Sequence, residues 1–230
     1  STRHISWARN GPNTIVGDTL RTLILNASPR KNWNTSQLLK AAERGARVVG
    51  GDVEYIDLYD LAFPGCRSCL ACKIKNSRRC HCFWNDDLSP IIDRVFASGA
   101  LIVGTPVYFG DVTSRFHAFA ERLRFVALSY DDFTSYFNGH VNLGFIVTMN
   151  VPLQRYEEEY EAKLTERFDG IARFLNGEVR VLPVCNTLQV DDYSKYAMSG
   201  FDEALKQHVH QTQFPRELEA AYQLGAKFSA

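Results

Sequence analysis

Residues 26–36, NASPRKNWNTS, decide the fold, because they join an apolar strand to a helical pattern. The strand is residues 22–26 (TLILN), and apolar residues recur at helical spacing after Leu38. A loop rich in hydroxyl and amide groups at this junction directs backbone N–H groups and the positive helix end toward an anion. We expect Asn34 to cap the helix, with Gln37 completing a capping-box-like pair.

Further apolar stretches repeat this alternation of strand and helix. The predicted strands are 53–58 (VEYIDL), 100–104 (ALIVG), 141–148 (VNLGFIVT) and 179–185 (VRVLPVC). The run at 100–104 is apolar throughout, which is typical of a strand covered on both faces. Alternating strands and helices predict right-handed crossovers and a parallel sheet between two helical layers. Five strands in this rhythm predict a three-layer α/β flavodoxin-like fold of order 2-1-3-4-5, with its ligand beyond the carboxyl ends of the strands.

The size and charge of the chain exclude several classes of protein. Its 230 residues suffice for one core, so we expect an N-terminal arm at 1–19 and a single domain at 20–230 with a C-terminal helical extension. Lysine plus arginine and aspartate plus glutamate number 26 each, and this balance argues against a nucleic-acid partner. No apolar run approaches the ~20 residues of a membrane helix, so no membrane association is expected. The arm lacks the apolar stretch of a signal peptide, which favours the cytoplasm.

A second loop, residues 105–113 (TPVYFGDVT), follows the third strand at the predicted switch point of the sheet. Pro106 stiffens this loop, and Gly110 lets the backbone approach a flat ligand closely. Tyr108 and Phe109 supply aromatic surface for stacking. Each loop alone also fits an ordinary helix start or turn. Together they predict a site for a flat ring system that carries one phosphate.

The pattern S-P-R-x-x-x-N-T-S at 28–36 with T-P-V-Y-F-G at 105–110 resembles the NADPH-dependent FMN reductase family and its iron–sulfur flavoprotein branch. The resemblance implies that the FMN phosphate is held by Ser28, Arg30, Asn34, Thr35 and Ser36. It implies that the isoalloxazine ring lies along Pro106, Val107, Tyr108, Phe109 and Gly110. A third contact loop is expected after the fourth strand, around Thr148, Met149 and Asn150, with Asn150 as its cofactor-binding residue. Trp33 departs from the family, whose members often have glycine there.

The cysteines form a second pattern in the segment 64–87. Five of the six fall within seventeen residues, as Cys66, Cys69, Cys72, Cys80 and Cys82. The C-x2-C-x2-C run is a [4Fe–4S] spacing, and the segment resembles the cluster motif of the iron–sulfur flavoproteins. Cys80 and Cys82 both stay open as the fourth ligand. A structural zinc site and free or redox-active thiols are the alternatives to a cluster.

These features predict an FMN-dependent oxidoreductase that transfers electrons between NAD(P)H or a ferredoxin-like donor and an acceptor, with a [4Fe–4S] cluster as relay. The flavin carries the chemistry, so no side chain is predicted to be catalytic. The resemblance implies a homodimer or homotetramer in which the cluster of one subunit faces the flavin of another. The alternatives are a cluster-free NAD(P)H-dependent FMN or quinone-type reductase, a non-enzymatic flavodoxin-like electron carrier, and a flavin-free interaction module held by zinc.

Overall fold

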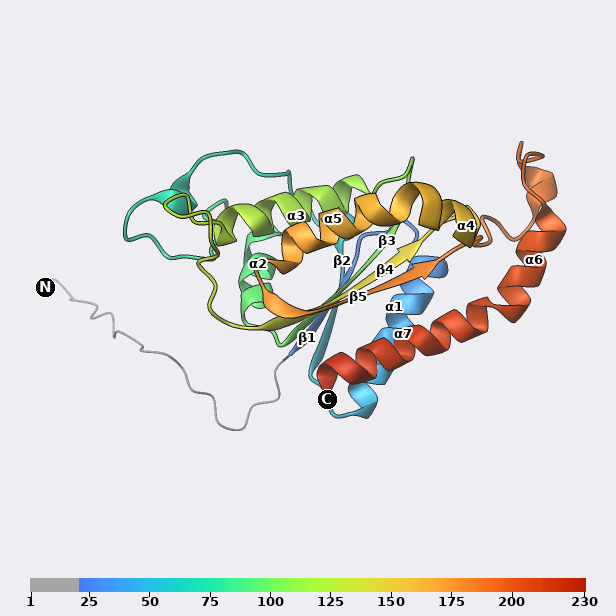
Figure 1. The fold of residues 1–230 in the computed structure, drawn as a ribbon, viewed down its shortest axis with the longest axis horizontal. Helices are drawn as coiled ribbons and strands as arrows, with labels where there is room; N and C mark the ends of the chain where they lie inside the picture. Colours follow the sequence, from blue (N-terminus) through green and yellow to red (C-terminus); the bar gives the residue numbers. More distant parts are fainter. Residues whose placement is uncertain (1–20) are drawn as a thin grey trace, which may run out of the picture.

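Five parallel strands form the centre of the computed structural model, which describes residues 21–230 (Figure 1). The strands are β1 (Thr22–Asn26), β2 (Val53–Asp57), β3 (Ala100–Pro106), β4 (Val141–Thr148) and β5 (Asn176–Val184). Their order is β2-β1-β3-β4-β5, and every neighbouring pair is parallel. This confirms the predicted flavodoxin-like order. The predicted N-terminal arm, residues 1–19, lies outside the described residues.

Helices cover both faces of the sheet (Figure 1). One face carries α2 (Ser89–Phe96), α3 (Ser114–Ala127) and α5 (Glu161–Ala172). The other carries α1 (Asn34–Val48) and α7 (Phe214–Ser229). The remaining helical segments are α4 (Leu153–Arg155), a π-helical turn (Tyr156–Tyr160), α6 (Glu203–Thr212) and short 3₁₀ turns at Leu58–Asp60, Ala71–Lys73 and Tyr193–Lys195.

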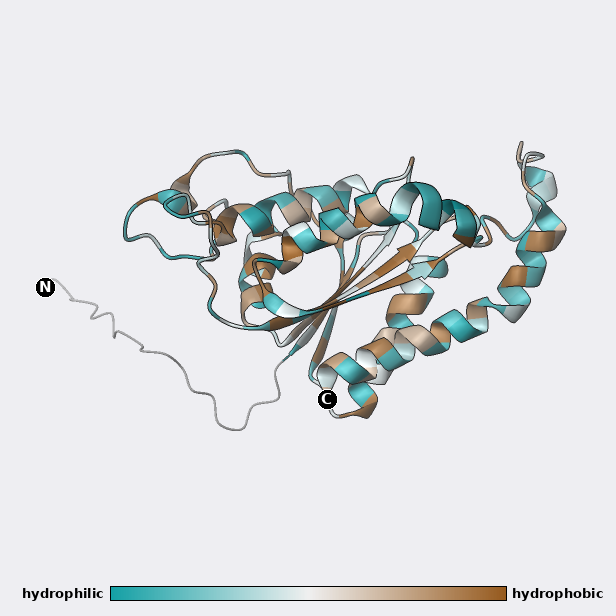
Figure 2. Ribbon diagram, viewed as in Figure 1, coloured by the Kyte–Doolittle hydropathy of each residue, from teal (hydrophilic) through white to brown (hydrophobic). Residues whose placement is uncertain are grey.

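The central strands are buried on both faces, and Figure 2 shows them as the brown, apolar middle of the molecule. Side chains alternate along β3, so Leu101 and Val103 pack into the core under α3 while Ile102 packs into the core under α1. This two-sided burial explains the continuous apolar run predicted for the strand. The carboxyl ends of the strands, where polar loops follow, are therefore held by a rigid base.

The C-terminal helix α7 packs closely along α1 because glycines stand at their contact. A Cβ atom at Gly225 would lie 1.9 Å from the carbonyl oxygen of Ala42, and one at Gly45 would lie 1.9 Å from that of Tyr222. No other residue fits at either position without moving a backbone. The predicted helical extension is thereby fastened to the helix whose first turn faces the carboxyl edge of the sheet.

Three predicted strand boundaries differ from the observed ones. The second strand ends at Asp57, one residue early, because Leu58 begins a 3₁₀ turn. The third continues to Pro106, paired with Thr148 of β4. The fifth spans Asn176–Val184 because its first residue already pairs with Val141. These boundaries depend on tertiary pairing partners that local sequence does not reveal.

Candidate cofactor-binding site

A cavity of about 320 Å³ opens at the carboxyl ends of the strands, between the loops that follow β1, β3, β4 and β5. It is lined by Ser28, Arg30, Trp33, Asn34, Thr35, Pro106, Val107, Tyr108, Phe109, Thr148, Met149, Asn150, Thr187 and Gln189. All the predicted cofactor residues except Ser36 and Gly110 therefore lie in one cavity. Among these lining residues, Arg30 is the positively charged one, and none is an aspartate or a glutamate. Its size and place match those of ligand sites in this class of sheet.

Short-range hydrogen bonds hold the loop after β1. The side-chain oxygen of Asn26 accepts from Ser28 N at 3.0 Å, and the hydroxyl of Ser28 accepts from Arg30 N at 3.2 Å. Ser36 donates its hydroxyl to the Trp33 carbonyl at 3.0 Å, which directs this side chain into the loop. Ser36 therefore shapes the loop, and Ser28 lies at the cavity surface.

The helix α1 begins at Asn34, on the edge of the cavity, with no side-chain cap from the part of the chain that the structure describes. The predicted capping pair is wrong. Asn34 donates its amide to the Leu188 carbonyl at 2.8 Å, and Gln37 donates to the Asn32 carbonyl at 3.2 Å. Asn34 has a tertiary acceptor that its neighbours in sequence do not predict. The uncapped first turn contains no acidic residue, so its N–H groups and positive dipole suit an anion.

The loop after β5 closes one side of the cavity through its backbone carbonyls. Leu188 accepts from Trp33 Nε1 at 3.0 Å, and Gln189 accepts from Arg30 Nη1 at 2.7 Å. The Arg30 guanidinium also lies over the Trp33 ring, with 4.2 Å from Cζ to the ring centroid. Sequence reasoning missed this wall, including Thr187. The sequence feature that pointed to this wall is Trp33, which stands where the family often has glycine and which donates to the Leu188 carbonyl.

The loop after β4 supplies Thr148, Met149 and Asn150, the three positions where the resemblance implied a third contact loop. Thr187 donates its backbone N–H to the Met149 carbonyl at 3.0 Å, so the loops after β4 and β5 run together. The hydroxyl of Thr148 meets that of Thr35 across the cavity wall. The cavity thus has a polar side around α1 and a second side formed by the loop after β3.

The loop after β3 is a tight turn that carries aromatic side chains. Tyr108 and Asp111 exchange backbone hydrogen bonds of 2.8 and 3.1 Å. Phe109 and Gly110 between them have φ of 53° and 74°, the left-handed pair of a type I′ turn. Gly110 supplies this conformation and packs beside Tyr160, outside the cavity lining. Phe109 is fully exposed, which leaves its ring free to cover a ligand.

Asp111 holds this loop against the helical layer. Its carboxylate accepts from Arg167 at 2.7 Å, with Lys163 at 3.4 Å and His117 at 3.5 Å. Burial alone would raise the pKa of Asp111, but the hydrogen bond from Val112 N and the Arg167 charge hold that pKa below its ordinary value. The carboxylate therefore stays ionised and anchors the loop.

The cysteine-rich segment packs against the C-terminal half of α3. Cys66, Cys69, Cys72 and Cys82 line one small cavity, and Cys80 lies outside it. Burial raises the pKa of the Cys72 thiol, and raises that of Cys80 to about 11. Within the described residues 21–230, no three Cys, His, Asp or Glu side chains lie close enough together to hold a metal ion. The four thiols share a cavity without forming a closed ligand set.

Arg122 lies at the base of the cysteine cavity and is almost fully buried. It donates to Cys82 Sγ at 3.1 Å and pairs with Asp86 at 2.5 Å. His81, between the last two cysteines, contacts Asp93 at 2.8 Å rather than a thiol. Cys82 is therefore the cysteine whose sulfur accepts a hydrogen bond from a buried charged side chain.

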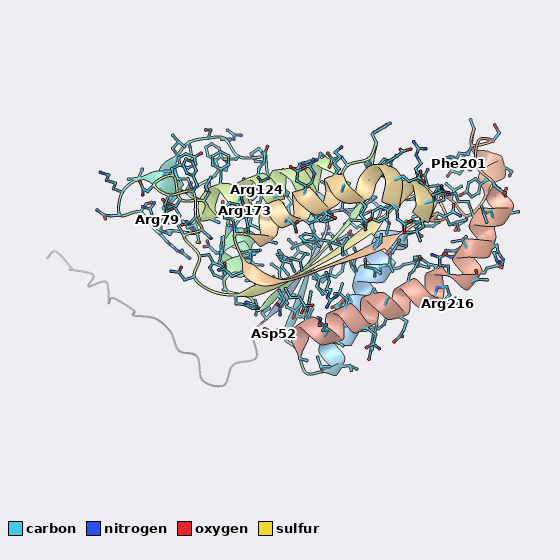
Figure 3. The ribbon with its side chains drawn as sticks, viewed as in Figure 1. Asp52, Arg79, Arg124, Arg173, Phe201 and Arg216 are labelled. Carbon is cyan, nitrogen blue, oxygen red and sulfur yellow. The ribbon has the colours of Figure 1, made fainter. Side chains whose placement is uncertain are left out.

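The cysteine cavity and the cofactor cavity lie at different ends of α3. The helix begins at Ser114 beside the loop after β3, and the Cys72 thiol contacts the carbonyl of Phe125, eleven residues further on. Eleven residues of α-helix span about 16 Å. In Figure 3, Arg79 of the cysteine segment and Phe201, next to α6, stand near opposite ends of the molecule. Although the segment follows β2 at the carboxyl edge, its thiols lie well away from that edge.

The strand order and the cavity at the carboxyl edge define a flavodoxin-like α/β protein. A family model described as NADPH-dependent FMN reductase matches residues 20–150, more than half of the chain. The chain belongs to the NADPH-dependent FMN reductase family.

Individual relatives agree with this family. An iron–sulfur flavoprotein of Archaeoglobus fulgidus is 33% identical over 94 residues, which are 41% of this chain and 44% of the relative. One of Methanosarcina thermophila is 26% identical over 98 residues, 43% of this chain and 49% of the relative. The chain spans about half the length of the curated relatives it matches.

Solved structures share the fold at low sequence identity. The NAD(P)H:quinone oxidoreductase from Methanothermobacter marburgensis has a TM-score of 0.67 at 15% identity, covering 93% of this chain and 98% of that one. An azoreductase from Bacillus anthracis has a TM-score of 0.62 at 10% identity, covering 90% and 99%. These similarities support the fold.

Within residues 21–230, no helix is both long and apolar enough to cross a membrane.

Proposed function

We propose that the chain is an FMN-dependent oxidoreductase that transfers electrons between NAD(P)H or a ferredoxin-like donor and an acceptor, with residues 20–230 acting as one domain. The observation that carries this proposal is the asymmetry of the cofactor cavity. One side holds the uncapped start of α1 and Arg30, and the opposite side is the aromatic loop after β3. No carboxylate lies in the described lining to repel a phosphate. A flat ring with one phosphate suits such a cavity.

Each side of the cavity has its own role in this proposal. The first-turn N–H groups of α1, with the hydroxyls of Ser28 and Thr35, bind the phosphate. Val107, Tyr108 and Phe109 lie along the ring and exclude water from it. FMN, when bound, supplies the hydride and electron chemistry. The chain's residues bind and orient it, and none needs to act as an acid or base.

We further propose that Cys66, Cys69, Cys72 and Cys82 hold a [4Fe–4S] cluster. The support is their shared cavity, the thiolate preference of such clusters and the iron–sulfur flavoproteins among the relatives. Binding requires the four thiols to move together. A cluster there would supply one-electron transfer. Zinc or redox-active thiols in the same cavity stay as the alternative, since the thiols form no closed metal group in the described residues.

We also propose a homodimer or homotetramer. The separation of the cysteine cavity from the cofactor cavity along α3 favours an arrangement in which the cysteines of one subunit approach the cofactor cavity of another. Light scattering of the purified chain gives the number of subunits.

The function is tested by an anaerobic absorption spectrum of freshly purified protein, with iron, sulfide and flavin analysis. We expect one equivalent of FMN per chain, bleached by NADPH or by a reduced ferredoxin. Four equivalents of iron would support the cluster, and FMN without iron would favour the cluster-free reductase. A colourless protein that takes up no FMN would contradict the proposed function.

A further inference from the structure

Lys206, on α6, is buried beside the wall of the cofactor cavity, with 3% of its surface exposed. Its ammonium donates to the Asn150 carbonyl at 2.5 Å and to the Asn186 side-chain oxygen at 2.7 Å. Asn150 lines the cavity, and Asn186 precedes Thr187, which also lines it. One lysine of the C-terminal helices therefore joins the loops that follow β4 and β5.

The same two loops are also paired through their backbones. Asn186 donates its N–H to the Val151 carbonyl at 2.7 Å, and Thr187 donates to the Met149 carbonyl at 3.0 Å. Asn186 has a left-handed φ of 53°, a conformation that asparagine adopts more readily than most residues. These bonds set the spacing of the loops, and Lys206 fixes it from behind the cavity wall.

The Lys206 charge has no carboxylate partner among residues 21–230. Its ammonium lies over the Phe201 ring, with 5.6 Å from Nζ to the ring centroid. Burial lowers the pKa of Lys206 to about 8, so the ammonium form predominates at neutral pH. A buried cation without a counter-charge is costly, and an anion in the adjacent cavity reduces this cost.

We propose that Lys206 is a positioning residue of the cofactor site, which fixes the wall formed by Asn150 and Thr187 and contributes a positive charge that favours an anionic ligand. The inference rests on the proposed function, because it takes FMN as that ligand. Lys206 lies beyond residues 20–150, the part matched by the family model. Its role is a property of the C-terminal extension of this chain.

The test compares variants by FMN titration of apo-protein and by the reduction potential of bound FMN. Lys206→Met removes both the charge and the hydrogen bonds, Lys206→Gln keeps a donor, and Asn186→Gly removes one acceptor while tolerating the left-handed φ. Lys227→Met is the control, because this lysine lies near the end of α7, pairs with Glu178 of β5 and does not line the cofactor cavity.

We expect Lys206→Met to weaken FMN binding by about tenfold, because the wall formed by Asn150 and Thr187 is no longer held in place and a positive charge beside the anionic ligand is lost. The potential of bound FMN moves to a more negative value in both Lys206 variants, because a positive charge favours reduction. Lys206→Gln regains part of the affinity but not the potential. Asn186→Gly weakens binding and leaves the potential unchanged, and Lys227→Met alters neither quantity.

Wild-type affinity and potential in both Lys206 variants would overturn this inference alone. If Lys206→Met does not fold, unchanged affinity in both Lys206→Gln and Asn186→Gly would overturn it equally. A wild-type chain that binds no FMN would instead contradict the proposed function.

Discussion

The hydroxyl oxygens of Thr35 and Thr148 lie 2.7 Å apart and share a buried hydrogen bond. Thr35 stands in the first turn of α1, and Thr148 is the last residue of β4. Both line the cofactor cavity. The bond therefore fixes the anion-facing helix start to the central sheet.

Replacing Thr148 with valine keeps the shape of the side chain but leaves the Thr35 hydroxyl without this partner. We expect the free energy of unfolding to fall by about 1–3 kcal/mol. Thr35→Val/Thr148→Val should cost less than the sum of the two single variants, because no orphaned hydroxyl remains. Urea denaturation measures these values, with the exposed Thr165→Val as control. A Thr148→Val protein as stable as the control would contradict the role given to this bond.

Asp111→Asn should loosen the loop after β3 in a pH-dependent way. The pKa of Asp111 is lower in the folded chain than the ordinary value of about 3.9, so its ionised form stabilises the fold above that value. This stabilisation is lost as the pH falls through the folded pKa. The stability difference between wild type and Asp111→Asn therefore shrinks below about pH 4. Urea denaturation across this range checks it. A difference that does not shrink in acid, or one equal to that of the exposed Asp131→Asn, would show that Asp111 is no anchor.

Phe109→Ala should separate ligand binding from stability. Because Phe109 is fully exposed, we expect the free energy of unfolding to change by less than about 0.5 kcal/mol. The affinity for FMN should fall roughly three- to tenfold as the stacking surface is lost. Phe133→Ala is the control, since Phe133 is also exposed and has a similar φ of 60° but does not line the cofactor cavity. Equal FMN affinities of the two variants in fluorescence titration would remove Phe109 from the site.

The two candidate fourth ligands should behave differently when replaced by serine. Cys82→Ser should abolish bound iron, because Cys82 shares the cavity of Cys66, Cys69 and Cys72. Cys80→Ser should retain the iron, and both variants should keep one equivalent of FMN, because the cysteine and cofactor cavities are separate. Iron and sulfide assays with flavin analysis give the result. Iron lost with Cys80 and kept with Cys82 would reverse the assignment.

The strand order could be predicted from sequence because each strand is a short apolar run followed by a helical pattern. β1 and β4 have the predicted bounds, since each is a local apolar run that ends in a polar residue, Asn26 or Thr148. The bounds of β5 depend on pairing with Val141, and the start of α1 depends on the acceptor at Leu188. Both are contacts between segments far apart in the chain.

In the candidate site, too, the residues that sequence could predict are those that belong to a local pattern. The loops after β1 and β3 carry compact local patterns, and most of their predicted residues line the cavity. Thr187 and Gln189 follow β5 with no local pattern, and they enter the cavity only because that strand lies beside β4. Sequence spacing likewise left Cys80 and Cys82 equivalent, whereas the contact of Cys82 with Arg122 distinguishes them.

Calorimetric titration of the apo-protein with FMN and with riboflavin tests the central claim most directly, because the two ligands differ only in the phosphate. Charge-assisted hydrogen bonds at the start of α1 should make FMN bind about a hundredfold more tightly than riboflavin. Equal affinities for the two flavins, or no binding of either, would contradict the assignment of this cavity to a phosphorylated flavin.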